Sequence, residues 1–200
     1  AVVNSLEELQ DILKKGVNSE EIFSSSSDPQ EIAFLFTGQG SQYVGMGKDL
    51  YEQHPIFKKS LDKCANILQQ YFSESILDIL FAKENHKEKI NNTLYAQPLL
   101  FAVEYSLAQL WQSWGIKPSF LLGHSLGEYV AACVGGVFDL PDVLKLVVTR
   151  AKLMAALPVG GSMISLFAKR EAVEEAISME PEVSIAAVNG PGSVVITGTK

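Results

Sequence analysis

Short apolar runs alternate with longer amphipathic stretches along the chain. Residues 32–37 (IAFLFT) and 119–124 (SFLLGH) are apolar, and each run stops at a glycine-rich turn, which is typical of buried strands. Helices are predicted where proline or a capping residue precedes a helical pattern. These helices run from Pro55 to about Gln70, over 74–81, from Pro98 to Gly115, from Ser125 to about Gly135 and from Pro141 to about Ala156, and a charged loop is predicted over 83–92. Strands separated by helices indicate a parallel α/β sheet.

The pattern changes after residues 157–161 (LPVGG). A strand is predicted over 162–168, a helix over 170–179, and two further strands over 183–190 and 193–200. This β-α-β-β order is the first part of a ferredoxin-like split β-α-β unit. The predicted fold class is therefore α/β, with a parallel-sheet large subdomain and the start of a ferredoxin-like small subdomain that the chain leaves incomplete.

The first 30 residues have a different texture from the rest. Ser5 and Glu8 form a capping-box pattern at the start of a short amphipathic helix that ends near Gly16. The serine-rich stretch 23–29 is a flexible joint by composition. The predicted organisation is a linker element over 1–30, a large α/β subdomain over 31–156 and a partial small subdomain over 157–200.

Composition and charge exclude some classes of protein. The net charge of −7 over 200 residues argues against general nucleic-acid binding, which requires a basic surface. The amino-terminal segment carries acidic residues and does not resemble a signal peptide, and no apolar run is long enough to cross a bilayer. Cys64 and Cys133 have neither CxxC nor metal-ligand spacing. We therefore expect a protein of the reducing cytoplasm, with no membrane span and no metal.

The sequence Gly-His-Ser-Leu-Gly at 123–127 is the strongest candidate for chemistry. It follows an apolar strand and precedes a helix, which is the context of a nucleophile elbow. The two glycines would allow a sharp turn, and the helix start would offer the Leu126 N–H to an oxyanion. The alternative is that Ser125 only caps the helix beside a close-packed glycine turn.

The glycine-rich stretch 36–48 (FTGQGSQYVGMGK) is not a phosphate loop. It matches neither the pattern G-x-x-x-x-G-K-[ST] nor G-x-G-x-x-G. It is either a tight turn that requires glycine conformations or a loop that brings a backbone N–H to a site.

Arg150 falls on the apolar face of its helix. At about 100° per residue it lies in the same stripe as Val143, Val147 and Met154. A guanidinium on an inward face needs an anion, because it stays charged and is costly to bury unpaired. The partner is either a carboxylate of the protein core or the carboxylate of a ligand, which arginine binds through two nitrogens.

The histidines do not supply a convincing general base. His54 precedes a helix, His86 lies in the charged loop, and His124 is adjacent to Ser125. Neighbouring residues in a turn point apart, so we expect His124 to support the elbow rather than to deprotonate the serine.

Five collinear stretches resemble the acyltransferase domain of modular polyketide synthases, the family of malonyl-CoA:acyl-carrier-protein transacylases. They are FTGQGSQYVGMG, QPLLFAVEYSLAQLWQSWGIKP, GHSLGEYVAACVGGVF, TRAKLMAALPVGGSM and VSIAAVNGPGSVVITG. The resemblance covers residues 31–200 and implies a hydrolase-like large subdomain. Residues 1–30 resemble the linker between ketosynthase and acyltransferase domains.

This resemblance implies the roles of six residues. Ser125 would be the nucleophile, and the backbone N–H groups of Gln39 and Leu126 would form the oxyanion hole. Arg150 would bind the free carboxylate of the malonyl group. Gln97 would line the acyl pocket, and His124 would support the site without acting as the base. The family's catalytic histidine is expected beyond Lys200, so the chain as given would lack its general base.

The resemblance also implies substrate and partners. The stretch 92–97 (NTLYAQ) and Leu126 are similar to those of malonyl-selective members. The expected substrate is malonyl-CoA, the acceptor is the phosphopantetheine of an acyl carrier protein, and no cofactor stays bound. Other domains of a multidomain synthase are expected partners. The alternatives are a non-catalytic fragment that docks acyl groups or carriers, and an α/β-hydrolase or thioesterase, which also has a G-x-S-x-G elbow.

Overall fold

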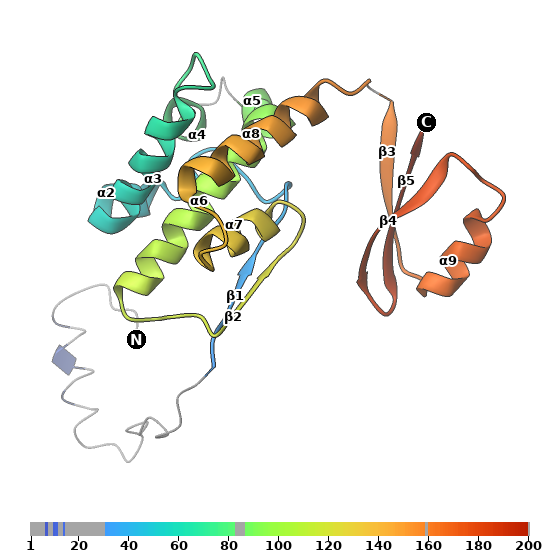
Figure 1. Ribbon diagram of the computed structural model, residues 1–200. Helices are drawn as coiled ribbons and strands as arrows, with labels where there is room; N and C mark the ends of the chain where they lie inside the picture. Colours follow the sequence, from blue (N-terminus) through green and yellow to red (C-terminus); the bar gives the residue numbers. More distant parts are fainter. Residues whose placement is uncertain are drawn as a thin grey trace.

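The computed structural model describes residues 31–82, 87–158 and 160–199, together with the single positions 7, 10, 11 and 14. Its elements, in chain order, are β1 (Ala33–Phe36), α2 (Lys48–Gln53), α3 (Pro55–Leu68), α4 (Ile76–Leu80), α5 (Lys87–Asn91), α6 (Thr93–Ser113), β2 (Phe120–Gly123), α7 (Gly127–Val134), α8 (Leu140–Ala155), β3 (Gly161–Leu166), α9 (Arg170–Ile177), β4 (Val183–Gly190) and β5 (Ser193–Thr199) (Figure 1). The four single positions are helical, and the rest of the predicted amino-terminal element lies outside the described residues.

The two strands β1 and β2 pair in parallel, with Ala33 opposite Phe120 and Phe36 opposite Gly123. The parallel α/β class predicted from the sequence is therefore confirmed. Because the strands are in register, both stop at the same edge of the sheet, and the turn that follows each strand starts from that edge. This arrangement places the turn after β1 beside the turn after β2.

The prediction that these strands are buried is wrong for one of their faces. Alternate residues along each strand point to opposite sides of a sheet. Phe34 and Phe36 face the hydrophobic core, whereas Leu35 on β1 is 71% exposed and Leu122 on β2 is 63% exposed. Within the described ranges the helices thus cover one face of the pair.

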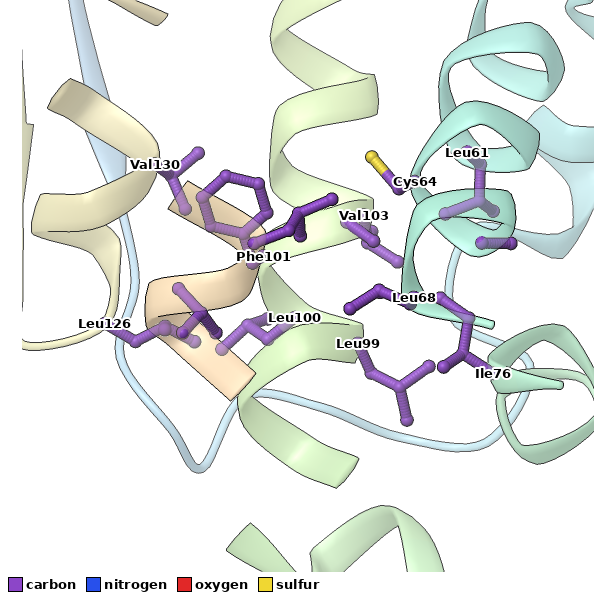
Figure 2. Close-up of a cluster of buried hydrophobic side chains, with 14 of the residues drawn as sticks. Leu61, Cys64, Leu68, Ile76, Leu99, Leu100, Phe101, Val103, Leu126 and Val130 are labelled. Carbon is purple, nitrogen blue, oxygen red and sulfur yellow. The ribbon is translucent and has the colours of Figure 1, made fainter. Parts of the chain in front are cut away.

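The helix α6 is the centre of the large subdomain and packs against α3, α7 and α8. The core contains large apolar side chains from α3, α4, α6 and α7, and from Leu126 just before α7. Figure 2 labels ten of these residues: Leu61, Cys64, Leu68, Ile76, Leu99, Leu100, Phe101, Val103, Leu126 and Val130. A helix that is apolar nearly all round is a buried one. The core therefore fixes the position of every residue carried by α6.

The prediction that α6 begins at Pro98 is wrong, because the helix begins at Thr93. The Asn92 side chain caps it by accepting a hydrogen bond from the Leu94 N–H at 2.9 Å. Pro98 lies inside the first turns, where its missing N–H removes one helical hydrogen bond. Asn92 therefore overrides the proline as the start signal.

The charged loop predicted over 83–92 contains a short helix, α5, at Lys87–Asn91. Ile90 is almost fully buried, and Lys89 forms an ion pair with Glu74 at 2.6 Å. One buried apolar side chain thus holds a segment whose composition indicated loop. Residues 83–86 lie outside the described part of the chain.

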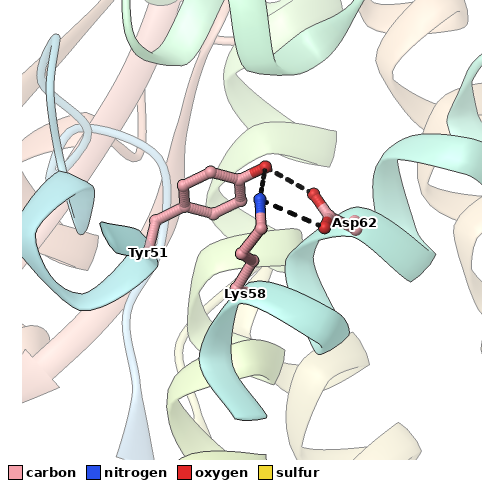
Figure 3. Close-up of polar contacts among 3 residues, drawn as sticks. All are labelled: Tyr51, Lys58 and Asp62. Atoms are coloured by element: carbon pink, nitrogen blue, oxygen red, sulfur yellow. Dashed lines mark hydrogen bonds and ion pairs between the residues drawn. The ribbon is translucent and has the colours of Figure 1, made fainter. Parts of the chain in front are cut away.

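Polar contacts join α2 to α3 (Figure 3). The Tyr51 hydroxyl donates to Asp62 Oδ1 at 2.7 Å, and Lys58 Nζ donates to the Tyr51 oxygen at 2.6 Å. The hydrogen bond with Tyr51 and the neighbouring Asp62 carboxylate raise the pKa of Lys58. These contacts hold α2, and with it the end of the turn that follows β1, against α3.

The strands β3, β4 and β5 form an antiparallel sheet in the order β3-β5-β4. Since β5 runs antiparallel to both neighbours, β3 and β4 are parallel to each other and separated by one strand, and α9 connects them. This is the split β-α-β arrangement, so the predicted ferredoxin-like start is confirmed. Figure 1 shows this unit to one side of the helices, joined to them through the end of α8.

Candidate active site

Ser125 lies in the sharp turn between β2 and α7. Its φ is 53°, in the left-handed region that a residue with a side chain rarely adopts. Such a conformation costs on the order of 1–3 kcal/mol and persists where the surroundings enforce it. The turn leaves the Ser125 side chain exposed at the carboxyl edge of the parallel strands. The residue at the N-cap of α7 is Leu126, and no side-chain hydrogen bond caps this helix, so the interpretation of Ser125 as a capping residue is wrong.

The two glycines of the motif are required by lack of space. A Cβ at Gly123 would lie 2.1 Å from the Glu128 nitrogen, and a Cβ at Gly127 would lie 2.3 Å from the Phe36 carbonyl oxygen. Both contacts are with backbone, which a small side-chain movement does not relieve. Strand β1 and helix α7 therefore approach as closely as they do only because residue 127 is glycine.

The turn after β1 lies against the elbow. The His124 N–H donates to the Phe36 carbonyl oxygen at 2.9 Å. A Cβ at Gly38 would be 3.0 Å from the His124 ring, so the ring and this glycine are in contact. Within the ranges that the structure describes, the N–H groups of Gln39 and Leu126 have no backbone acceptor. Both predicted oxyanion donors are thus available at adjoining turns.

A buried carboxylate holds the beginning of the turn after β1. Glu104 Oε1 on α6 accepts from the Thr37 N–H at 2.7 Å and from the Thr37 hydroxyl at 2.6 Å. Its second oxygen, Oε2, is buried without a hydrogen-bond partner among the described residues. Burial raises the pKa of Glu104, and the two hydrogen bonds from Thr37 lower it in part. Glu104 was not predicted as a site residue, although a single acid within the apolar stretch FAVEYSLA (101–108) could have indicated a buried polar role.

Arg150 on α8 reaches the serine. Its Nη2 donates to Ser125 Oγ at 3.3 Å, its Nη1 donates to Gln97 Oε1, and its guanidinium carbon lies 5.7 Å from the centre of the Tyr129 ring. In the part of the chain that the structure describes, no carboxylate forms an ion pair with it. The alternative of a salt bridge to a core carboxylate is therefore not observed. A guanidinium with an uncompensated charge beside a hydroxyl suits chemistry on an anionic acyl group.

Gln97 is fully buried and is joined to two residues that the sequence interpretation missed. Its Nε2 donates to Thr93 Oγ1 at 2.6 Å and lies 3.3 Å from Met154 Sδ. The Thr93 hydroxyl donates in turn to Gln39 Oε1 at 2.8 Å. Thr93 precedes Gln97 by four residues on α6, and Met154 follows Arg150 by four on α8. This helical spacing could have indicated both.

One network of side chains therefore contains four of the six predicted site residues. It runs from Gln39 through Thr93 and Gln97 to Arg150 and Ser125. The Leu126 side chain is in the core, so the prediction for this residue concerns its backbone N–H alone.

His124 lies outside this network. Between the described residues, no hydrogen bond joins the His124 ring to Ser125. The His54 ring packs edge-on against the Trp114 ring, with the ring centres 5.6 Å apart, and His86 lies outside the described residues. The structure thus brings no described histidine to the serine hydroxyl, and the nature of the base stays a prediction.

Neither cysteine is a candidate nucleophile. Cys64 and Cys133 are both free and buried, and burial raises the pKa of Cys64 to about 12 and that of Cys133 to about 11. A thiol at these values is not ionised at neutral pH. Over the described ranges there is no cluster of three or more metal-binding side chains, and no helix is both long and apolar enough to cross a membrane.

Comparisons with known proteins place this arrangement among enzymes. The sequence profile described as acyl transferase domain matches residues 33–200. The chain is 40% identical over 198 residues to the PKS-NRPS hybrid synthetase acdB of Aspergillus candidus, a match that covers 96% of this chain and 8% of that protein.

Two solved structures extend the comparison. The acyltransferase domain from the second module of the salinomycin polyketide synthase matches with a TM-score of 0.88 and 37% identity, over 100% of this chain and 48% of that one. A malonyl-transacylase in complex with its type II polyketide acyl-carrier protein matches with a TM-score of 0.76 and 33% identity, over 86% of this chain and 56% of that one. The chain therefore spans about half of the solved domains and a small part of the synthetase.

Proposed function

The chain belongs to the acyl transferase domain family of polyketide synthases, and from this premise we propose that it transfers a malonyl unit from malonyl-CoA to an acyl carrier protein. The family predicted from the sequence motifs is confirmed by the matches. The donor, the acceptor and the seryl ester are our proposal.

The position of Arg150 is the single observation that carries the proposal. Its guanidinium has no carboxylate partner in the described ranges, and its Nη2 lies 3.3 Å from Ser125 Oγ. The three-carbon malonyl group has a carboxylate at one end and a thioester carbonyl at the other. A carboxylate on Arg150 would therefore place the carbonyl beside the serine.

The chemistry follows as a two-step exchange. Ser125 Oγ attacks the thioester carbonyl, its proton passes to a base, and the negative charge on the carbonyl oxygen is met by the N–H groups of Leu126 and Gln39. The C–S bond breaks and coenzyme A leaves with a proton. The phosphopantetheine thiol of the carrier protein then attacks the seryl ester, which moves the malonyl group to sulfur and restores the Ser125 hydroxyl.

The base in this scheme would be a histidine, as the family resemblance implies. Its ring would take the serine proton in the first step and return a proton to the leaving group. His124 would keep the elbow in place through its contact with Gly38. No cofactor stays bound in this scheme, and no metal takes part.

The choice of malonyl over other acyl groups rests on the same arginine and on two further observations. A plain acetyl group would leave the Arg150 charge without an anion, at a cost in the transition state. Gln97, Met154 and the 92–97 stretch line the same region, and a malonyl-transacylase is among the matching structures. That enzyme was solved with its carrier protein, which supports a carrier as acceptor here.

The setting is part of the proposal. Residues 1–30 would be the linker to a ketosynthase domain, 31–156 and 157–200 the parts of the two subdomains, and the partners the other domains of a synthase in the cytoplasm.

The test uses the protein at its full natural length, incubated with malonyl-CoA and examined by intact mass spectrometry. The expected result is a malonyl adduct that is absent from Ser125→Ala and that disappears when a carrier protein with its phosphopantetheine is added. Release of free malonate without an adduct would favour the hydrolase alternative. Absence of any reaction would favour the non-catalytic docking alternative, which the lack of a described histidine at Ser125 keeps in consideration.

A further inference from the structure

We propose that Thr93 is a positioning residue that connects the oxyanion turn after β1 to the arginine that binds the acyl carboxylate. The inference rests on the proposed function and adds a residue and a task to it. Thr93 is the first residue of α6 and is partly buried between Gln39 and Gln97. The hydroxyl of Thr93 makes a hydrogen bond to each.

Arg150 fixes the direction of each hydrogen bond in the series that links it, through Gln97 and Thr93, to Gln39. A guanidinium has donors only, so the group of Gln97 that faces it must be the amide oxygen. The Gln97 NH₂ group then faces Thr93 and must donate, so Thr93 Oγ1 accepts from it at 2.6 Å. The Thr93 proton is left free to donate, and it goes to Gln39 Oε1 at 2.8 Å.

The burial of Gln97 makes the Thr93 hydroxyl necessary. Gln97 is fully buried, so water does not replace a lost partner, and an unpaired amide there carries the cost of desolvation. Apart from Thr93, the recorded contact of Gln97 Nε2 among the described residues is the sulfur of Met154, a weak acceptor, at 3.3 Å. Loss of the Thr93 hydroxyl would therefore free the Gln97 amide to rotate and loosen the hold on Arg150.

At its other end the hydroxyl holds the turn that carries an oxyanion donor. The Gln39 side chain is exposed, and a Cβ at the next residue, Gly40, would meet nothing within 4 Å, so packing does not fix this part of the turn. Gln42 is tied separately, by donation from its Nε2 to Asn91 at 3.1 Å. The hydrogen bond from Thr93 therefore holds the side chain of Gln39, the residue whose backbone N–H would stabilise the oxyanion.

The Thr93 hydroxyl therefore helps to set the position of the Arg150 guanidinium relative to the turn that contains Gln39. The carboxylate end of the acyl group would be held by Arg150, and the developing oxyanion by the turn containing Gln39. The angle between them must suit a three-carbon acyl group, because a small misplacement of either costs rate. Thr93 acts through both neighbours and touches no reacting atom.

The experiment compares Thr93→Val with Thr93→Ser in the protein at its full natural length. Valine keeps the shape and removes the hydroxyl, and serine keeps the hydroxyl. The measurement is the single-turnover rate of the malonyl adduct on Ser125 as a function of malonyl-CoA concentration. Thr149→Val is the matched control, since Thr149 is exposed on α8 beside Arg150 and its hydroxyl donates to the Lys145 carbonyl oxygen at 2.8 Å.

We expect Thr93→Val to lower the maximal rate about tenfold, the effect of one lost hydrogen bond, and to raise the half-saturating concentration by less. Thr93→Ser should stay within about threefold of the wild type, and so should Thr149→Val. The midpoint of urea unfolding of Thr93→Val should fall modestly, because the buried Gln97 amide loses a partner, but the protein should stay folded under the assay conditions, so the lower rate reports positioning rather than unfolding.

A double-mutant cycle with Gln39→Ala tests the route of the effect. Alanine keeps the backbone N–H of residue 39 and removes the side chain that Thr93 holds. If Thr93 acts partly through that side chain, the two substitutions together slow the adduct less than the product of their separate effects. If the slowing in the double variant equals the product of the two separate effects, Thr93 does not act through the Gln39 side chain, and the proposed link between Arg150 and the turn after β1 is overturned.

The outcomes separate this inference from the proposed function. An adduct that forms in Thr93→Val at the wild-type rate, and is absent from Ser125→Ala, overturns the role of Thr93 and leaves the proposed function standing. An adduct that persists in Ser125→Ala, or never forms, overturns the proposed function and this inference with it. Equal slowing by Thr93→Ser and Thr93→Val would mean that the methyl group matters rather than the hydroxyl, which also overturns the role.

Discussion

The turns that follow β1 and β2 leave the same edge of the sheet and are held in different ways. The elbow at 123–127 is fixed by backbone packing, since its two glycines leave no room for a Cβ. The turn at 37–47 is closely packed near its ends, where a Cβ at Gly38 would lie 3.0 Å from His124 and a Cβ at Gly47 would lie 2.9 Å from Phe57. Its middle has open space at Gly40 and Gly45 and is tied down by side-chain hydrogen bonds of Gln39 and Gln42. The elbow is rigid by shape, and the middle of the other turn is positioned by polar contacts.

The difference follows from what each turn has to present. Ser125 has to stand out of the turn at a φ of 53°, and only a tightly packed surrounding keeps a residue in that conformation. The turn after β1 has to offer a backbone N–H, for which a few hydrogen bonds are sufficient. Substitutions should therefore damage the elbow through shape and the other turn through lost polar partners.

The largest effect is expected at the elbow, from Gly127→Ala. The added Cβ would lie 2.3 Å from the Phe36 carbonyl oxygen and 2.7 Å from that of Thr37, so β1 and α7 would have to separate. We expect a loss of about 3 kcal/mol or more in the free energy of unfolding, measured in urea, together with loss of the malonyl adduct.

Gly45→Ala in the other turn is the matched control. Gly45 has a φ of 82° and nothing within 4 Å of a Cβ, so the cost is limited to conformational strain, about 1–2 kcal/mol. Equal losses of stability in the two variants would contradict the contrast between a turn fixed by shape and a turn fixed by polar contacts.

The next effect is expected from Arg150→Ala, which removes the side chain that contacts the elbow and is linked to the other turn by a series of hydrogen bonds. Arg150 touches the elbow through Ser125 directly and reaches the other turn through Gln97, Thr93 and Gln39. We expect malonyl transfer to fall about 100-fold or more, because a charge-assisted contact with the acyl carboxylate is lost in the transition state. Acetyl transfer, which does not use the charge, should fall much less.

The measurement is the ratio of malonyl to acetyl transfer at equal coenzyme A thioester concentrations. Arg150→Lys is the control for charge without the planar fork, and it should restore only part of the preference for malonyl. Equal losses of malonyl and acetyl transfer in Arg150→Ala would refute the carboxylate-binding role.

The smallest effect concerns Glu104, which holds Thr37 at the start of the polar turn. Burial raises the pKa of Glu104 above its usual 4.5, so the folded state binds the proton more tightly than the unfolded state does. Its favourable contribution is therefore present below the unfolded pKa and is lost as the pH rises through the folded pKa. Glu104→Gln keeps an oxygen for Thr37 and removes this titration.

We expect the two proteins to unfold alike in urea at about pH 4, and Glu104→Gln to be modestly the more stable at about pH 7. Glu104 lines a groove between β1 and α6 of about 460 Å³, whose other lining residues are mainly apolar. A wild type that gains stability over Glu104→Gln as the pH rises would mean that the buried Oε2 has a cationic partner.

The sequence predicted most elements correctly where local signals agreed with one another. Pro55 begins α3 as expected, and α8 begins one residue before Pro141, because in both places proline supplies the first turn of a helix. At Pro98 the same signal was wrong, because the helix is capped by Asn92, six residues before the proline. The short helix α5 was missed because its one anchor, Ile90, is recognisable only in the packed core.

For the site, the residues with a strong motif were found and their supports were not. Ser125, Gln39, Gln97 and Arg150 come together as one network, and their catalytic and binding roles stay predictions. Thr93 lies in the 92–97 stretch, but nothing in that stretch points to Gln39 as its partner, and Glu104 is a single acid in an apolar stretch, which occurs in many proteins. Their importance lies in which partners they meet, and those partners are 54 and 67 residues away in the chain.

The sequence by itself indicated the kind of chemistry, because a serine between two glycines after a strand and an arginine on an apolar helix face are local patterns with a local meaning. Only the tertiary structure decided that this arginine meets no described carboxylate, that it lies beside this serine, and that Thr93 joins it to the turn after β1. Local patterns state what a side chain needs. Which side chain meets that need depends on how β1, α6, α7 and α8 pack, and distant residues become neighbours only when the shared core brings those elements together.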